Sequence, residues 1–285
     1  MKRILILCPI VLFILIVKDR EGGIWIGTFY GGVNYLSPNT GQFECFAHFR
    51  FSNSVNGTVI GRFCEDTYGH IWIASDDGGL SCFSPKDKHF THYLPDEHRN
   101  SLSYHNVHAL CMDGDDLWIG TYTGGVNVLN TKTGVFRVYT TKAGDPTTLD
   151  RSSSYAIFKD REARIWVTSM SGVNLYNREE DNFTRIRDLG SWIMDIDQDA
   201  DGNIWFSSQG NGLFKYDPDK QEWTNYVHSS APGALINDQV NCVLIDGNGE
   251  MWIGTMNGLC KYNAKEDQFE LIPLDIPSSN ISVSY

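Results

Sequence analysis

Residues 113–126 read Asp-Gly-Asp-Asp-Leu-Trp-Ile-Gly-Thr-Tyr-Thr-Gly-Gly-Val, and this phrase recurs along the chain with a tryptophan as its anchor. The anchors lie 39 to 48 residues apart and are Trp25, Trp72, Trp118, Trp166, Trp205 and Trp252. An Asp precedes each anchor by five or six residues, and a Gly follows it by six or seven. An aromatic residue closes each copy: Phe43, Phe90, Phe136, Phe183, Trp223 and Phe269. A period of about 40–50 residues built from short strands predicts a β-propeller.

Each copy divides into four predicted strands. Strand A precedes the Asp, as in residues 107–112 and 240–245, and strand B carries the tryptophan, as in residues 71–75. Strand C follows the Gly, as in residues 126–129, and strand D carries the closing aromatic residue. Alternation with a period of two runs through these segments, and no segment has helical periodicity. We therefore predict an all-β propeller with six recognisable four-stranded blades, and we expect it to form part of a seven-bladed ring.

Two interpretations of residues 1–17 stay open. Lys2 and Arg3 precede an apolar run over residues 4–17, which suits an export signal or a membrane anchor. The same residues also suit strand A of the first blade, because Phe13 and Ile16 align with apolar positions of the other copies. Residues 18–285 are predicted to be the propeller. A seventh copy begins at Asn280, so we expect a piece of a longer protein or a truncated reading frame.

The composition disfavours nucleic acid as a partner. The chain has 35 acidic and 23 basic residues and a formal net charge of −12, which repels phosphate backbones. Its seven cysteines have no metal-site spacing, and four of them, Cys64, Cys82, Cys111 and Cys260, fall among apolar residues of predicted strands. His89 and His92, like His105 and His108, lie three apart, and such residues face opposite sides of a strand. We predict no metal and no cofactor.

Catalytic motifs are missing from the sequence, so we predict no enzymatic activity for this chain. The sequence varies most in the B–C and D–A connections, which share one face of a propeller, and variable loops on a rigid scaffold usually carry function. Aromatic rings combined with hydrogen-bonding groups suit sugars and other polar ligands. We predict a ligand site near the ring's central opening, formed by Tyr30, Asp77, Arg99, His105, Tyr122, Arg151 and Trp192.

The phrase at residues 113–126 resembles the two-component regulator propeller repeat, and residues 100–107 resemble the lead-in to that family's blades. The resemblance covers about residues 10–285. It implies the periplasmic, membrane-anchored sensor region of a hybrid two-component system histidine kinase that responds to glycan fragments. It also implies an oligosaccharide ligand, a homodimer, and further propeller, sensor and kinase regions of the parent protein as partners. The chain departs from the pattern because it has six anchors and no kinase residues, and because Ala163 replaces the turn Gly of blade four.

Two alternatives remain open beside the sensor hypothesis. Residues 202–206 also resemble the blades of streptogramin lyase-like propellers, which use a metal and a His base on the open face. The chain could equally be an interaction scaffold without a small ligand.

Overall fold

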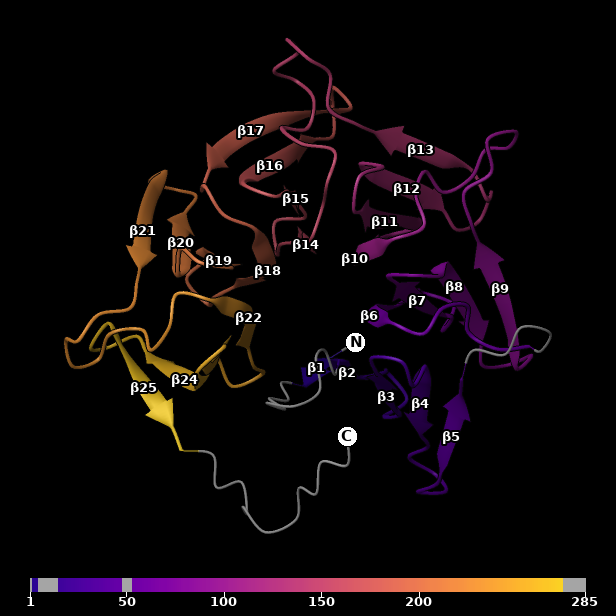
Figure 1. The fold of residues 1–285 in the computed structure, drawn as a ribbon, viewed down its shortest axis with the longest axis horizontal. Coiled ribbons are helices and arrows are strands. Elements are labelled where there is room, and N and C mark those ends of the chain that lie inside the picture. The colour runs from indigo at the N-terminus through magenta and orange to yellow at the C-terminus, as the bar shows by residue number, and fades with distance from the viewer. Residues whose placement is uncertain (1, 5–14, 48–52, 274–285) are drawn as a thin grey trace.

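The computed structural model describes residues 2–4, 15–47 and 53–273. These residues form 25 strands in six sheets, which Figure 1 shows arranged radially around a central opening. The prediction of an all-β propeller with six blades is confirmed. Among the described residues no helix is long and apolar enough to cross a membrane.

The strands follow the chain from the inner to the outer edge of each blade. Blades one and two comprise β1 (Lys2–Ile4), β2 (Leu15–Lys18), β3 (Ile24–Gly27), β4 (Val33–Leu36), β5 (Phe43–Phe46), then β6 (Ile60–Glu65), β7 (Ile71–Ser75), β8 (Gly79–Ser84) and β9 (His89–Tyr93). Blades three and four comprise β10 (Val107–Asp113), β11 (Asp116–Thr121), β12 (Val126–Asn130), β13 (Phe136–Tyr139), then β14 (Ile157–Lys159), β15 (Ile165–Thr168), β16 (Gly172–Asn177) and β17 (Asn182–Asp188). Blades five and six comprise β18 (Ile193–Gln198), β19 (Ile204–Ser208), β20 (Leu213–Asp217), β21 (Glu222–Tyr226), then β22 (Val240–Ile245), β23 (Met251–Thr255), β24 (Gly258–Asn263) and β25 (Gln268–Ile272).

Blade one differs from the others in having a fifth strand. β1 pairs antiparallel with β2 at the inner edge of this blade, near the centre of the ring in Figure 1. Ile16 lies in β2 and is buried, as expected for strand A, whereas Phe13 lies outside the described residues. The seventh copy predicted from Asn280 also lies outside the described residues, and the seven-bladed ring stays a prediction.

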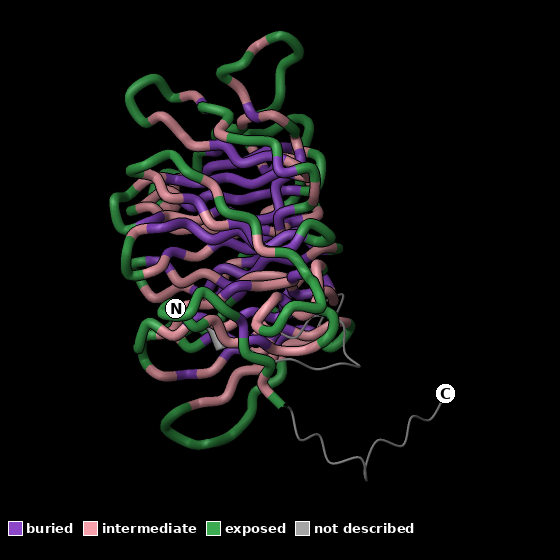
Figure 2. Tube along the Cα trace, turned by 90° about the vertical axis from the view of Figure 1, so that its left-hand side faces the viewer, coloured by how far each residue is buried: buried purple, intermediate pink, exposed green. Residues whose placement is uncertain are grey.

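The core consists of five apolar clusters, each between two consecutive blades. Five of the six anchor tryptophans are at most 2% exposed, and each belongs to a different cluster. Trp118, for example, packs with Ile157 and Val167 of the next blade. No cluster of the described residues contains Trp252, which is partly exposed. Figure 2 shows the consequence, with buried strand residues in the interior and exposed loops at the periphery.

The Asp of the repeat accepts a hydrogen bond from the anchor tryptophan. Indole Nε1 donates to the carboxylate six residues earlier in five blades, at 2.8, 3.1, 2.8, 2.7 and 3.3 Å from Trp25, Trp72, Trp166, Trp205 and Trp252. Blade three is the exception, because Asp113 pairs directly with Asp116 across a hairpin one residue shorter. Asp113 instead forms ion pairs with Lys159 and Arg178, and Nε1 of Trp118 has no hydrogen-bond partner among the described residues.

The Gly that follows the anchor is required by its close approach to strand D. Gly125 and Gly212 both have φ of +78°, in the left-handed region that side chains disfavour. A Cβ atom would lie 2.0 Å from the Tyr139 carbonyl oxygen at Gly125, and 2.1 Å from the Tyr226 carbonyl oxygen at Gly212. Glycine therefore recurs at this position of the repeat because the backbone of strand D leaves no room for a Cβ atom.

Candidate functional site

The B–C loops begin beside the start of strand A, at the inner rim of the ring. The amide N–H four residues after the anchor donates to the carbonyl that precedes strand A. This bond runs from Tyr122 to Asn106 at 3.1 Å and from Gln209 to Trp192 at 2.9 Å. The side chains at these positions therefore meet around the central opening, which Arg62 of β6 bridges by donating to the Met194 carbonyl of β18 at 3.2 Å.

A β-bulge directs one further residue toward this rim from the inner strands of four blades. The pairing of strands A and B shifts register at the second residue of the strand in four blades, at Gly61, His108, Met194 and Asn241. In blade four, Tyr155 lies at the position that corresponds to these four residues, just before β14. Bulges re-aim side chains and are frequent beside functional sites.

Four rim side chains form a continuous row that we call the aromatic arc: Tyr122, His108, Tyr155 and Trp192. The rings of Tyr122 and His108 stack with centroids 5.9 Å apart, and His108 meets Tyr155 edge-on at 4.9 Å. Tyr155 in turn stacks on Trp192 at 5.3 Å. Tyr122 and Trp192 are each 40% exposed, whereas Tyr155 is 6% exposed. The arc thus presents exposed ring faces at its two ends, with a buried tyrosine between them.

Polar groups accompany the arc. Asp76 Oδ1 lies 2.9 Å from His108 Nε2 and accepts a hydrogen bond from Asn106 Nδ2 at 3.1 Å. The His108 interaction is the largest influence on the pKa of Asp76, and it lowers that pKa against the effect of burial. The Tyr155 hydroxyl is buried and has no hydrogen-bond partner among the described residues. Burial, and then the charges of Tyr122 and Asp76, raise the pKa of Tyr155 to about 12, so the hydroxyl keeps its proton as a donor.

Of the seven residues predicted for the site, the structure brings Tyr122 and Trp192 together in the arc. Tyr30 lies on the same face in blade one, is 74% exposed and meets Phe29 edge-on at 4.3 Å. Asp77 holds its own loop, because it accepts hydrogen bonds from Thr58 N at 2.9 Å and Ser75 Oγ at 2.6 Å. His105 is exposed and stacks on Tyr104 at 4.7 Å.

The two predicted arginines lie elsewhere. Arg99 pairs with Asp96 at 3.3 Å, and the adjacent Asn100 accepts from Phe136 N at 2.6 Å, on the outer strand β13. Arg99 therefore belongs to the periphery of the ring. Arg151 lines a separate cavity with two further arginines of blade four.

Sequence reasoning missed the middle of the arc. His108 was not among the residues predicted for the site, but its side chain is only 21% exposed and lies between two aromatic rings of the arc. A bulge depends on pairing between strands, so single-strand alternation carries no signal for it. The described residues contain no group of three or more His, Cys, Asp or Glu side chains able to hold a metal.

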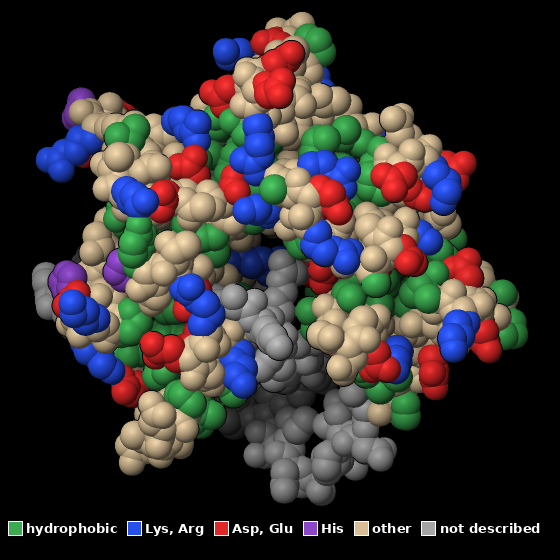
Figure 3. All heavy atoms as spheres, turned by 180° about the vertical axis from the view of Figure 1, so that it is seen from behind, with side chains coloured by type: hydrophobic (Ala, Val, Ile, Leu, Met, Phe, Trp, Pro, Cys, Tyr) green, Lys and Arg blue, Asp and Glu red, His purple; other side chains and the backbone are tan. Residues whose placement is uncertain are grey.

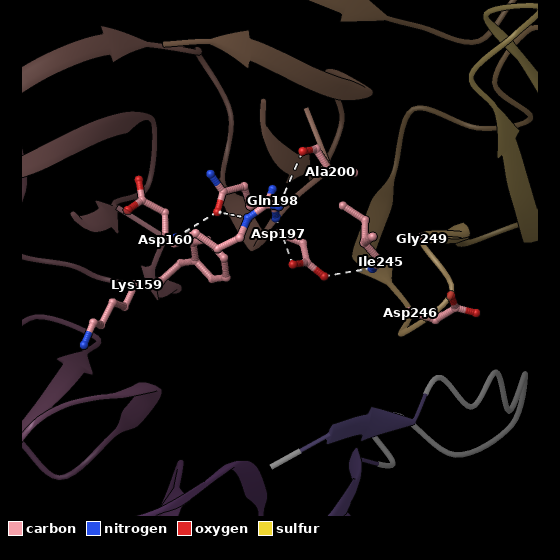
Figure 4. A pocket seen from close by; sticks show the side chains of 10 residues that line it. Lys159, Asp160, Asp197, Gln198, Ala200, Ile245, Asp246 and Gly249 are labelled. Carbon is pink, nitrogen blue, oxygen red and sulfur yellow. Dashed lines mark hydrogen bonds between the residues drawn. The ribbon is translucent and has the colours of Figure 1, made fainter. Parts of the chain in front are cut away.

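A second cavity, of about 360 Å³, lies between the inner strands of blades four to six (Figure 4). Its polar groups bind one another: Asp197 accepts from Ile245 N at 2.8 Å, and Gln198 Oε1 accepts from Arg161 N at 2.9 Å. Because these contacts join the blades, we assign this cavity to the scaffold. Figure 3, from behind, shows positive and negative side chains interspersed without a patch of one sign.

The family model described as two component regulator propeller matches residues 101–123 and 234–257, in blades three and six. This match confirms the resemblance noted from the repeat. The histidine kinase P4 of Formosa agariphila is 24% identical over 184 residues, which are 61% of this chain and 13% of that protein. The chain therefore spans about an eighth of this curated relative.

Solved structures share the fold. The extracellular domain of the putative hybrid two component system BT3049 from B. thetaiotaomicron has a TM-score of 0.56 and 22% identity, over 88% of this chain and 40% of that one. PorZ, a surface component of the type-IX secretion system of Porphyromonas gingivalis, has a TM-score of 0.66 and 16% identity, over 88% of this chain and 38% of that one. At these identities the likeness concerns the fold alone.

Proposed function

We propose that this chain is a non-catalytic, ligand-sensing propeller from the periplasmic sensor region of a hybrid two-component system, and that it binds glycan fragments at the aromatic arc. The match to the regulator propeller repeat and the similarity to a histidine kinase support the sensor role. The observation that carries the binding role is the arc itself, in which loops of three blades place exposed aromatic faces beside polar groups at one opening.

The chemistry of the arc suits a sugar ring. The apolar C–H face of a sugar packs on the exposed faces of Tyr122 and Trp192, as in small-molecule sites that combine apolar walls with a few oriented polar groups. Asp76, whose side chain is half-exposed, supplies an acceptor for the hydroxyl groups at the edge of that ring.

Binding would reach the rest of the sensor through the parent protein. In this proposal the kinase regions of that protein, and a homodimer of the sensor, are the partners that receive the signal. The extracellular solved structure BT3049 supports the periplasmic location.

The test begins with a glycan array and proceeds to titration calorimetry with the best oligosaccharide. Changing Tyr122→Ala and Trp192→Ala together should weaken binding at least about 30-fold, since losing hot-spot rings costs about 2 kcal/mol or more. The melting temperature should stay nearly the same. Tyr68→Ala, which removes an exposed aromatic ring from an A–B turn, is the matched control and should bind as the unchanged chain does. An unchanged affinity in the double variant would place the site elsewhere.

The streptogramin lyase-like alternative predicts a different outcome. His108, beside Asp76 on the open face, is the histidine that such an enzyme would use as its base. Chemical conversion of a bound ligand in the presence of a divalent metal, lost in His108→Gln, would establish the enzyme and contradict the sensor proposal.

A further inference from the structure

Three arginines of blade four line one cavity and have no carboxylate partner at ion-pair distance among the described residues. They are Arg151, Arg185 and Arg187, and the cavity measures about 320 Å³. In this acidic chain most other arginines of the described part pair with Asp or Glu, as Arg137 does with Asp116 at 2.7 Å. Three arginines that lie together without ion pairs in the described part of the chain therefore need an explanation.

Two of these guanidinium groups are held in place by neutral groups. Arg185 donates from Nε to the Thr148 carbonyl at 2.9 Å and from Nη2 to the Asp145 carbonyl at 2.8 Å. Arg185 also interacts with the Asp145 carboxylate, whose pKa is lowered by hydrogen bonds from Thr147 and, to a smaller extent, by the charges of Lys142 and Arg185. Arg187 lies over the ring of Trp223, 5.3 Å from its centroid. Neutral carbonyls and ring faces fix a cation in place and leave its charge available to a ligand.

The repeat is interrupted at this cavity in three respects. Arg187 occupies a strand D position that is aromatic in four other blades, at Phe46, Tyr93, Tyr139 and Tyr226. The pairing of β16 with β17 also contains a register shift after Val173, which no other described C–D pairing has. Gly172 lacks the positive φ of its counterparts, and a Cβ there would lie 2.2 Å from an Asp150 carboxylate oxygen.

We propose that this cavity is an oxyanion site for a carboxylate or a sulfate group. Planar guanidinium groups match such groups with paired hydrogen bonds. The carboxylates that line the cavity are bound to other groups: Asp150 accepts from Ser169 Oγ at 2.7 Å, and Asp188 accepts from Gly190 N at 2.8 Å. Among the residues that line the cavity, three arginines and two aspartates leave one net positive charge, which fits a monoanionic group, and Asp145 lies outside this lining. The cavity shares no lining residue with the aromatic arc, and the proposal does not rest on glycan binding there.

Inorganic sulfate is the first probe. We expect sodium sulfate to raise the melting temperature of the full chain with half-saturation in the millimolar range, relative to sodium chloride at equal ionic strength. Arg151→Gln combined with Arg187→Gln should shift the half-saturating concentration at least tenfold upward. Arg99→Gln, which removes one exposed positive charge elsewhere, is the control and should leave the response unchanged.

An equal rise in the unchanged chain and the double variant would overturn the proposal, because sulfate also stabilises proteins by general exclusion from their surface. If the double variant is itself unstable, Arg151→Gln alone decides, since Arg151 is exposed and makes no ion pair among the described residues. A single variant with the response of the unchanged chain would then contradict the site.

Sugar probes separate the two sources of the anion. Galacturonate binding at least tenfold tighter than sulfate, and lost in the double variant, identifies an oxyanion carried on a sugar. Galacturonate binding no tighter than sulfate identifies a free anion as the ligand. Neutral galactose binding as well as galacturonate in this cavity would contradict an oxyanion site altogether.

Discussion

The left-handed turn residue of blade four shows how a single side chain departs from the repeat. Ala163 stands where other A–B turns have glycine, and its φ is +61°. A residue with a Cβ atom in this region is strained by about 1–2 kcal/mol. Glycine would remove that strain. It would also lose more backbone entropy on folding, which lowers the gain in the free energy of unfolding by about 0.4–1 kcal/mol.

Ala163→Gly should therefore raise the free energy of unfolding by about 0.5–1 kcal/mol, measured by urea denaturation. Ala200→Gly, in the equivalent turn of blade five, is the matched control because Ala200 has no positive φ. That change should lower stability slightly. A loss of stability in Ala163→Gly would show that the alanine is unstrained.

The buried hydroxyl of Tyr155 is expected to affect folding and not binding. It has no hydrogen-bond partner in the described part of the chain, so its burial costs the folded protein free energy. Tyr155→Phe should therefore keep or slightly raise the melting temperature, and it should leave the affinity for an oligosaccharide at the arc unchanged, because a ligand does not reach a buried hydroxyl. A less stable variant would show that the hydroxyl has a structural partner.

Among the elements, the positions of the strands and their grouping into blades could be predicted, and the register between paired strands could not. The predicted strand at residues 71–75 is β7, because the alternation of apolar residues reflects burial between blades. Phe43 was predicted to close blade one, yet it is 63% exposed, and Phe46 stacks near Trp25 instead, at 6.2 Å. Which aromatic residue meets the anchor depends on register, which one strand's sequence does not contain.

The candidate site shows the same division. Tyr122 and Trp192 could be predicted because they interrupt the repeat, in loops of the face that the B–C and D–A connections share. His108 is placed by a bulge, Tyr155 by a hydrogen bond from its N–H to the Thr168 carbonyl, and Arg187 by the register shift of β17, so their positions follow from hydrogen bonding between strands. The hydrogen bonds that hold a loop to its neighbours cannot be predicted from the sequence either. Arg99 was therefore expected at the central opening, although the adjacent Asn100 binds the outer strand β13.

The B–C loop of blade two should depend on pH through Asp77. Burial alone would raise the pKa of Asp77, but hydrogen bonds from Ser75 and Thr58 lower it to about 2. Its unfolded value is about 3.9, so the loop contacts are fully present above that pH and are lost as the pH falls through about 2. NMR titration of the Thr58 and Val59 amides should show a midpoint near the lower value, and a midpoint near 4 would mean that Asp77 does not hold the loop.

At the scale of the whole molecule, the inter-blade tryptophans are not equivalent. Trp118 is 1% exposed and packs against blade four, so Trp118→Ala should cost about 3–5 kcal/mol. Trp252 belongs to no cluster of the described residues, and Lys261 lies over its ring at 5.5 Å. Trp252→Ala in the same chain should cost clearly less, about 1–2 kcal/mol, by chemical denaturation. Equal costs would show that the Trp252 face is covered as fully as the others.

The two faces of the propeller have different roles in this account. The face with the A–B turns carries the Asp residues that hold the tryptophans, and the face with the B–C loops carries the aromatic arc. Hydrogen–deuterium exchange with and without a bound oligosaccharide tests this division directly. Protection should appear in residues 104–108, 121–124, 152–156 and 190–194, which contain the arc, while residues 66–70 and 160–164 of the A–B turns exchange unchanged. Protection confined to the A–B turns would contradict the proposed site.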